Sequence, residues 1–175
     1  AECRIIKSLR ELELMQHASD ITMAAYKETV KHIELGMRGF DINDLSRQAH
    51  AALGVSGSLG TMLGVVSSSP HGSIVEPLLE EGMIVLMDGG CNVHNYASDI
   101  SRTFVFGNHT AEQEEVWNLE KAAQAAGFAA AQLGAPQENV DIAARKVITD
   151  AGYGPGYKTP GLPHRTGHGI GLDMH

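Results

Sequence analysis

Two stretches of this chain, residues 87–104 and 163–175, concentrate acids and histidines. They contribute Asp88, Asp99, His168 and the last residue, His175. Carboxylate oxygens and imidazole nitrogens, with no cysteine cluster beside them, are ligands typical of hydrated Mn, Co, Fe or Zn sites. If these groups serve one site, the fold must bring together two segments that are far apart along the chain.

The two acids are the stronger part of this argument. Asp88 follows the apolar run 83–87, where a carboxylate loses hydration unless a cation compensates it. Alone, Asp88 is better explained as a turn residue. Asp99 lies eleven residues further on, where a turn between two strands would place it beside Asp88. Two adjacent carboxylates repel each other unless a cation lies between them, so the pair predicts a metal site.

The first half of the chain has the pattern of helices followed by strands. Ser8 and Glu11 have capping-box spacing and predict a helix that ends near Gly36. Asp41 is expected to cap a second helix. Short apolar runs then predict strands of one antiparallel or mixed sheet, at residues 62–66, 83–87, 91–96 and 100–106.

The second half begins with a similar helix pair. Thr110 and Gln113 repeat the capping-box spacing and predict a long helix that ends near Gly134. Asn139 or Asp141 is expected to begin another helix, which ends at 151–152. Two related halves and a chance match explain this repetition equally well. The predicted fold class is α+β, with helices packed on the sheet.

Composition limits the classes of protein to consider. The chain has 175 residues, 43% of them hydrophobic and 19% charged, which is typical of a soluble globular domain. Its formal net charge of −8 argues against nucleic-acid binding. No apolar run approaches the roughly 20 residues of a membrane span, and the start lacks a signal-peptide pattern. Cys3 and Cys91 imply no disulfide framework, so we expect a cytoplasmic protein.

Three further histidines are candidates for chemistry. His71 lies in a loop rich in serine, proline and glycine, and His164 and His175 flank His168. Loop histidines shuttle protons or donate hydrogen bonds to a developing oxyanion, but each of these is equally well explained as a solvent-exposed imidazole. Cys91 is expected to be a packed thiol. No function is assigned to the remaining histidines, His17, His32, His50, His94 and His109.

Together the motifs resemble those of the creatinase/aminopeptidase metallopeptidases, which have the "pita-bread" fold. Asp88-Gly89-Gly90 with Ser98-Asp99 and Ser101-Arg102-Thr103 is similar to the family's first ligand signature, and 166–173 with His175 to its histidine signature. The resemblance extends from about Arg4 to the end of the chain. It implies that Asp88 chelates one metal ion, Asp99 bridges two and His168 binds the other. It also implies catalytic roles for His71 and His175 and a substrate-binding role for His164.

Within the family, the ending 172–175 is more similar to Xaa-Pro dipeptidases (prolidases) and Xaa-Pro aminopeptidases than to methionine aminopeptidases. Creatinases share the fold but lack the metal-binding acids, so Asp88 and Asp99 argue against that branch. The resemblance implies two divalent ions, Mn first among them, an Xaa-Pro peptide substrate and a homodimer. Methionine aminopeptidase and a non-catalytic peptide- or protein-binding member of the fold are the alternatives.

The chain departs from the family pattern in three ways. Asn95 occupies a position where glycine is common, and Ser101 replaces the usual threonine. The two glutamate ligands that the family supplies after the histidine motif have no counterpart here, because nothing follows His175. We therefore expect residues 1–175 to form a single, partial (truncated) catalytic domain without the family's N-terminal domain. This chain alone is expected to bind metal weakly and to have little activity.

Overall fold

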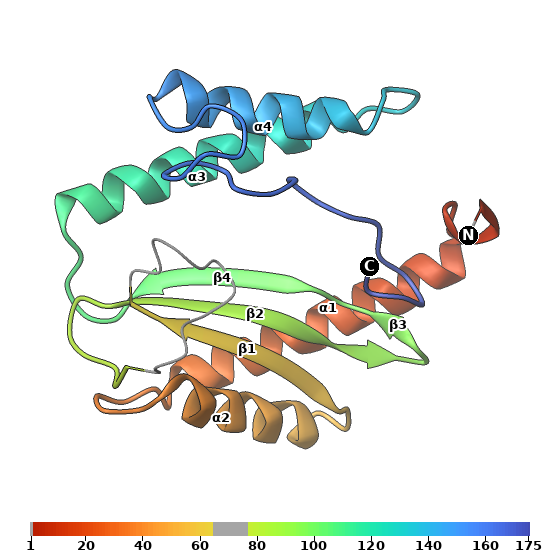
Figure 1. Ribbon diagram of the computed structural model, residues 1–175. Helices are drawn as coiled ribbons and strands as arrows, with labels where there is room; N and C mark the ends of the chain where they lie inside the picture. Colours follow the sequence, from red (N-terminus) through yellow and green to blue (C-terminus); the bar gives the residue numbers. More distant parts are fainter. Residues whose placement is uncertain (1, 65–76) are drawn as a thin grey trace. The chain divides into compact units, whose positions relative to one another are not determined.

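The computed structural model describes residues 2–64 and 77–175. The chain forms two compact units, one comprising residues up to 108 together with 169–175, and the other residues 109–168. Figure 1 shows their helices and strands. His71 lies outside the described residues. In the parts of the chain that the structure describes, no helix combines the length and the apolar composition that crossing a membrane requires.

Helix α1 of the first unit spans Leu9–Val30 and begins as predicted, with a capping box formed by Ser8 and Glu11. The predicted end near Gly36 is wrong, because the helix ends at Val30. Gly36 instead adopts a positive φ of 83° and donates a backbone hydrogen bond to the Leu79 carbonyl. The glycine therefore serves the turn that follows the helix.

Helix α2 spans Gly39–Ala52, and its N-cap residue is Arg38. The prediction that Asp41 caps this helix is wrong, because Asp41 occupies the third helical position. Its carboxylate accepts a hydrogen bond from the Arg38 backbone N–H at 2.8 Å and favours the helix start from there. Ile42 is fully buried, and α2 packs against both α1 and the first strand.

The sheet is antiparallel, which resolves the open choice between antiparallel and mixed. Its strands are β1 (Gly57–Leu63), β2 (Ile84–Val93), β3 (Tyr96–Ala97) and β4 (Ile100–Val105). Strand β2 pairs with each of the other three. It runs through Gly89 and Gly90 and so joins the strands predicted at 83–87 and 91–96, and β1 begins five residues before the predicted start at 62.

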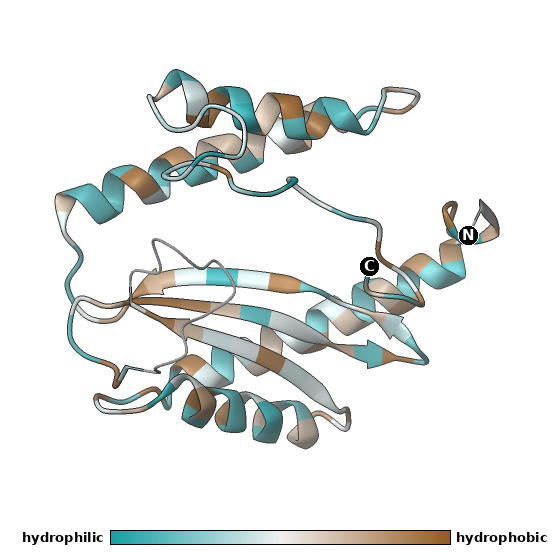
Figure 2. Cartoon of the chain, viewed as in Figure 1, coloured by the Kyte–Doolittle hydropathy of each residue, from teal (hydrophilic) through white to brown (hydrophobic). Residues whose placement is uncertain are grey.

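Alternate residues of β2 face in opposite directions, as in any strand. Val85 and Met87 are fully buried in a cluster with Tyr26 and Ile42 on the helix-covered face of the sheet. Figure 2 shows the apolar beginning of β2 giving way to more hydrophilic residues further along the strand. Asp88 lies between the core residues and the glycines, and it is exposed.

The second unit is a helix pair followed by a loop. Helix α3 (Ala111–Ala130) begins with the predicted capping box of Thr110 and Gln113, and α4 spans Glu138–Asp150. The predicted boundaries near 134 and at 139 or 141 are a few residues off, because α3 ends at Ala130 and Gln137 precedes α4. The core of the pair consists of small residues and one isoleucine: Ala123, Ala144 and Ile148.

Candidate metal centre

Asp88 is positioned by strand pairing on both sides. In the sheet register it lies opposite Gly60 of β1 and Ser101 of β4. The Ser101 hydroxyl donates a hydrogen bond to Asp88 Oδ1 at 2.6 Å, which fixes the orientation of the carboxylate. Because Met87 points into the core, Asp88 points to the opposite face of the sheet.

The two glycines after Asp88 allow the neighbouring strands to approach closely. A Cβ atom on Gly90 would overlap the carbonyl oxygen of Ser98. A Cβ atom on Gly89 would overlap the carbonyl oxygen of Ser58 in β1. Both obstacles are backbone atoms, so no side-chain rearrangement relieves them. The glycines are therefore required by the way the strands pack around the carboxylate.

The position of Asp99 is set by the hairpin that reverses the chain after β2. His94 and Asn95 form its turn with positive φ angles of 48° and 70°, which confirms the turn that was expected between the two acids. Gly89 pairs with Ile100 and Asp88 with Ser101, so the register continued by one residue sets Asp99 opposite Gly90. Asp88 and Asp99 are then diagonal neighbours on one face of the sheet.

The C-terminal segment 169–175 is held on the first unit. The Ala97 N–H of β3 donates to the Gly171 carbonyl at 2.8 Å, and Gly171 is buried. Arg4 forms an ion pair with Asp173, with 2.7 Å between Nη1 and Oδ2. This pair is exposed and contributes little stability by itself, but it joins the two ends of the unit. The contacts hold the segment that ends at His175 beside β3, which precedes Asp99.

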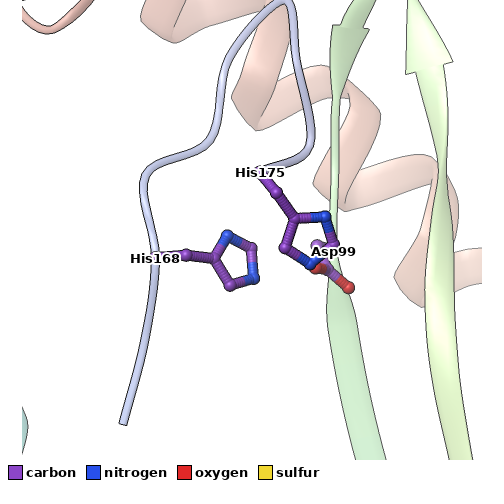
Figure 3. A group of neighbouring side chains, drawn as sticks. All are labelled: Asp99, His168 and His175. Carbon is purple, nitrogen blue, oxygen red and sulfur yellow. The ribbon is translucent and has the colours of Figure 1, made fainter. Parts of the chain in front are cut away.

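One group of acids and histidines among the described residues has metal-ligand spacing. Figure 3 shows Asp99, His168 and His175, whose ligand atoms all lie within 4.8 Å of one another. His168 is bonded directly to Gly169, where the chain returns to the first unit. Asp88 is not a member of this group. Which of these residues binds metal remains a prediction, as does the assignment of His175 to catalysis.

The loop that carries His164 is fixed by a residue that sequence reasoning missed. Arg145 of α4 donates to the backbone carbonyls of Gly156, Leu162 and His164 and forms a two-point ion pair with Asp141. Asp141 in turn accepts hydrogen bonds from the backbone N–H and the hydroxyl of Thr166, two residues before His168. The Asp141–Arg145 spacing of four residues was the available signal.

Electrostatics in this loop follow from those contacts. Hydrogen bonding from the Arg145 guanidinium, followed by that from Thr166, holds the pKa of Asp141 below its ordinary value. Asp141 therefore stays ionised and accepts four hydrogen bonds in total from the two residues. The prediction that Asp141 or Asn139 begins the helix gave no hint of this role. The His164 ring itself contacts the Arg165 carbonyl, with 2.9 Å between Nδ1 and the oxygen.

The sequence pattern of metallopeptidase family M24 matches residues 13–175. The chain belongs to this family. An uncharacterised peptidase of Staphylococcus saprophyticus is 31% identical over 181 residues, covering 100% of this chain and 47% of that protein. A second, from Staphylococcus haemolyticus, is 33% identical over 149 residues, covering 85% of this chain and 38% of that protein.

Solved structures agree with this assignment. The X-Pro aminopeptidase of Thermotoga maritima superposes with a TM-score of 0.89 at 30% identity, over 99% of this chain and 49% of that one. The Xaa-Pro dipeptidase of Bacillus anthracis has a TM-score of 0.89 at 30% identity, over 99% of this chain and 48% of that one. The prolidase of Pyrococcus furiosus has a TM-score of 0.87 at 29% identity, over 99% of this chain and 51% of that one. The M24 chain thus has the α+β pita-bread fold and spans about half the length of these relatives.

Proposed function

We propose that this M24 peptidase, in its complete form, hydrolyses the peptide bond that precedes proline and uses two divalent metal ions. Asp88, Asp99 and His168 would hold the ions, and residues 1–175 would form one part of the catalytic domain. The observation that carries the proposal is the register of β2 with β4, which, continued by one residue, puts Asp88 and Asp99 on the sheet face opposite the core. The solved relatives named for Xaa-Pro substrates support the choice of bond.

The donor set fits divalent ions of intermediate hardness. Carboxylate oxygens and imidazole nitrogens suit Mn best in this proposal, with Co, Fe or Zn as alternatives. The hydroxyl of Ser101 holds one oxygen of Asp88 and leaves the other for a ligand role. Three ligand residues do not complete two coordination spheres, so this chain alone is expected to bind metal weakly.

Bound divalent ions would activate water and polarise the scissile carbonyl. The remaining steps fall to side chains of this chain. His175, beside Asp99, is suited to donate a hydrogen bond to the carbonyl oxygen as negative charge develops there. His71, or His175 itself, would deliver a proton to the imino nitrogen of the leaving proline, and His164 would contact the substrate. Proline offers no N–H to bind, so shape and these histidines must provide recognition.

Metal titration of the full-length gene product tests the ligand assignment directly. Asp99→Asn should weaken binding of Mn²⁺, followed by calorimetry, by more than about 100-fold, because the loss of a direct ligand exceeds the effect of an outer residue. Asp20→Asn, an exposed carboxylate on α1, is the matched control and should bind as the unaltered chain does. Equal affinity in the Asp99 variant would remove the basis of the proposal.

Substrate assays on the full-length gene product separate the proposal from its rivals. Mn- or Co-loaded protein should cleave Xaa-Pro dipeptides or longer Xaa-Pro peptides. Cleavage of Met-initiated tripeptides instead would identify a methionine aminopeptidase. Binding of peptides without cleavage in either series would identify a non-catalytic member of the fold.

We also propose that the complete protein is a cytoplasmic homodimer. Size-exclusion chromatography with light scattering measures its mass, and cell fractionation its compartment. A monomer at micromolar concentration or a secreted product would contradict this part of the proposal alone.

A further inference from the structure

The backbone pairing changes where the chain passes from β3 to β4. Ser98 donates its backbone N–H to the Cys91 carbonyl at 2.9 Å, as expected in an antiparallel ladder. The Cys91 N–H, however, donates to the Ser98 hydroxyl at 3.1 Å. The side chain of Ser98 thus takes a place that a backbone carbonyl usually fills, and Asp99 directly follows this irregular residue. The direction of the Asp99 side chain therefore depends on the contacts that hold Ser98.

Helix α1 holds Ser98 through Thr22. The two hydroxyl oxygens lie 2.8 Å apart, and both side chains are buried. Thr22 Oγ1 also lies 3.5 Å from the sulfur of Cys91, whose thiol donates in turn to the Ala18 carbonyl at 3.4 Å. As expected from the sequence, Cys91 is a buried thiol. These contacts tie the irregular residue to a helix that carries none of the candidate ligands.

One helical turn after Thr22, the same helix contacts the residue on the other side of Asp99. The hydroxyl of Tyr26 donates to the Ile100 carbonyl at 3.0 Å. Burial, followed by the nearby charges of Asp88 and Asp99, raises the pKa of Tyr26 above its ordinary value. Because a carbonyl oxygen has no hydrogen to donate, the Tyr26 hydroxyl is the donor in this contact. Thr22 and Tyr26 thus contact both chain neighbours of Asp99 from one helix face.

We propose that Thr22 and Tyr26 are positioning residues that set the direction of the Asp99 carboxylate by holding Ser98 and Ile100. The consequence for metal affinity rests on the proposed function, whereas the constraint on the backbone does not. Hydrophobic packing of α1 alone would not need either hydroxyl, because valine and phenylalanine fill the same volumes. The hydroxyls are therefore the groups to remove.

The test uses near-isosteric substitutions, with exchange and carbon signals measured on this chain and Mn²⁺ binding on the full-length gene product. Thr22→Val and Tyr26→Phe should speed amide hydrogen exchange at Cys91 and Ser98, or broaden the ¹³C signal of the Asp99 carboxyl group. Each should weaken Mn²⁺ binding about 10-fold, the lower end for residues that orient a ligand. Thr22→Ser should restore both properties. Thr29→Val is the matched control, because Thr29 is also buried on α1, and its hydroxyl donates to the Ala25 carbonyl of its own helix.

The outcomes separate positioning from general destabilisation. A lower melting temperature in Thr22→Val, Tyr26→Phe and Thr29→Val alike, with local exchange, the carboxyl signal and Mn²⁺ affinity unchanged, would overturn the proposal. Altered exchange at Cys91 and Ser98 in Thr22→Val but not in Thr29→Val supports it. If the unaltered full-length gene product binds no Mn²⁺ or Co²⁺ at all, the proposed function loses its metal site, while the exchange and carbon signals still decide whether α1 positions Asp99.

Discussion

The two units of this chain position their candidate residues in different ways. In the first unit, Asp88 lies in a strand and Asp99 directly before one, in a sheet whose other face packs against two helices through large apolar side chains. In the second, the loop before His168 is held mainly by Arg145 and Asp141 of one short helix. The positions of the two acids thus depend on many long-range contacts, whereas the conformation of the histidine loop depends mainly on one local ion pair and the hydrogen bonds of its two residues. A single substitution should therefore have very different consequences in the two units.

The largest effect is expected in the core of the first unit. Met87→Ala removes a fully buried side chain beside Asp88 and should lower the free energy of unfolding by about 3 kcal/mol, through lost burial and the cavity left behind. Chemical denaturation measures the change. Leu133→Ala, which truncates a fully exposed side chain in the second unit, should leave that free energy within about 0.5 kcal/mol. Similar losses in both variants would contradict the comparison.

A smaller and more local effect is expected in the second unit. Asp141→Asn removes the charge that binds Arg145 and Thr166. It should lower the free energy of unfolding by about 2 kcal/mol, which is within the range for hydrogen bonds to charged groups. Hydrogen exchange should increase in 156–168, with β2 unaffected. The control is Asp150→Asn on the same helix, whose exposed pair with Lys146 contributes little. Exchange that increases equally in β2 would argue against separate behaviour of the units.

The ion pair between Asp141 and Arg145 predicts that the stability of the loop 156–168 depends on pH. The folded-state pKa of Asp141 is lowered, so its contribution is complete above the unfolded-state value and is lost as pH falls below that value. Acid should therefore loosen the loop 156–168 in the unaltered chain. The Asp141→Asn variant should show no such acid-dependent change in that loop, because the titrating carboxyl group is gone.

The orientation of Asp88 offers a finer test within the first unit. Ser101→Ala removes its hydrogen-bond donor and should weaken Mn²⁺ binding about 10-fold, with little change in stability. Ser101→Thr keeps the hydroxyl and should bind as the unaltered chain does. Calorimetric titration of both variants gives the comparison. Unchanged binding by Ser101→Ala would show that the hydroxyl does not orient the carboxylate for metal.

The smallest effect concerns Glu11 at the start of α1. Hydrogen bonds from the Ser8 backbone and the Tyr96 hydroxyl lower its pKa to about 2. The stabilisation from ionised Glu11 is present above its ordinary value of 4.5 and is lost as pH falls toward about 2. NMR titration should therefore show it ionised at pH 4. Tyr96→Phe should raise this pKa only part of the way, because the larger contribution of the Ser8 backbone remains.

Local signals in the sequence predicted part of this structure well. Both capping boxes begin helices where the spacing indicated, and the turn between the two acids lies at His94 and Asn95. These features depend on residues three or four positions apart, or on the backbone of two neighbours, so they can be predicted without knowing the fold. The family signatures likewise identified the M24 fold, because they require particular residue types at fixed spacing.

Other features depended on contacts between distant segments. Gly36 was expected to mark the end of α1, but its pairing with Leu79 makes it a turn residue instead. Nothing in the sequence pattern pointed to the contacts of Thr22 with Ser98 or of Tyr26 with Ile100, because packing of α1 on the sheet creates them. The spacing of Asp141 and Arg145 indicated an ion pair, but the contact of Arg145 with the Leu162 carbonyl depends on the path of the loop.

The sequence by itself determined the types of the candidate ligands, the order of the motifs and the starts of two helices, because each is encoded in short-range spacing. The tertiary structure decided that Asp88 and Asp99 share a sheet face, and it decided which buried hydroxyl groups hold the chain beside Asp99. Those arrangements follow from strand register and helix packing, which are set by the whole core.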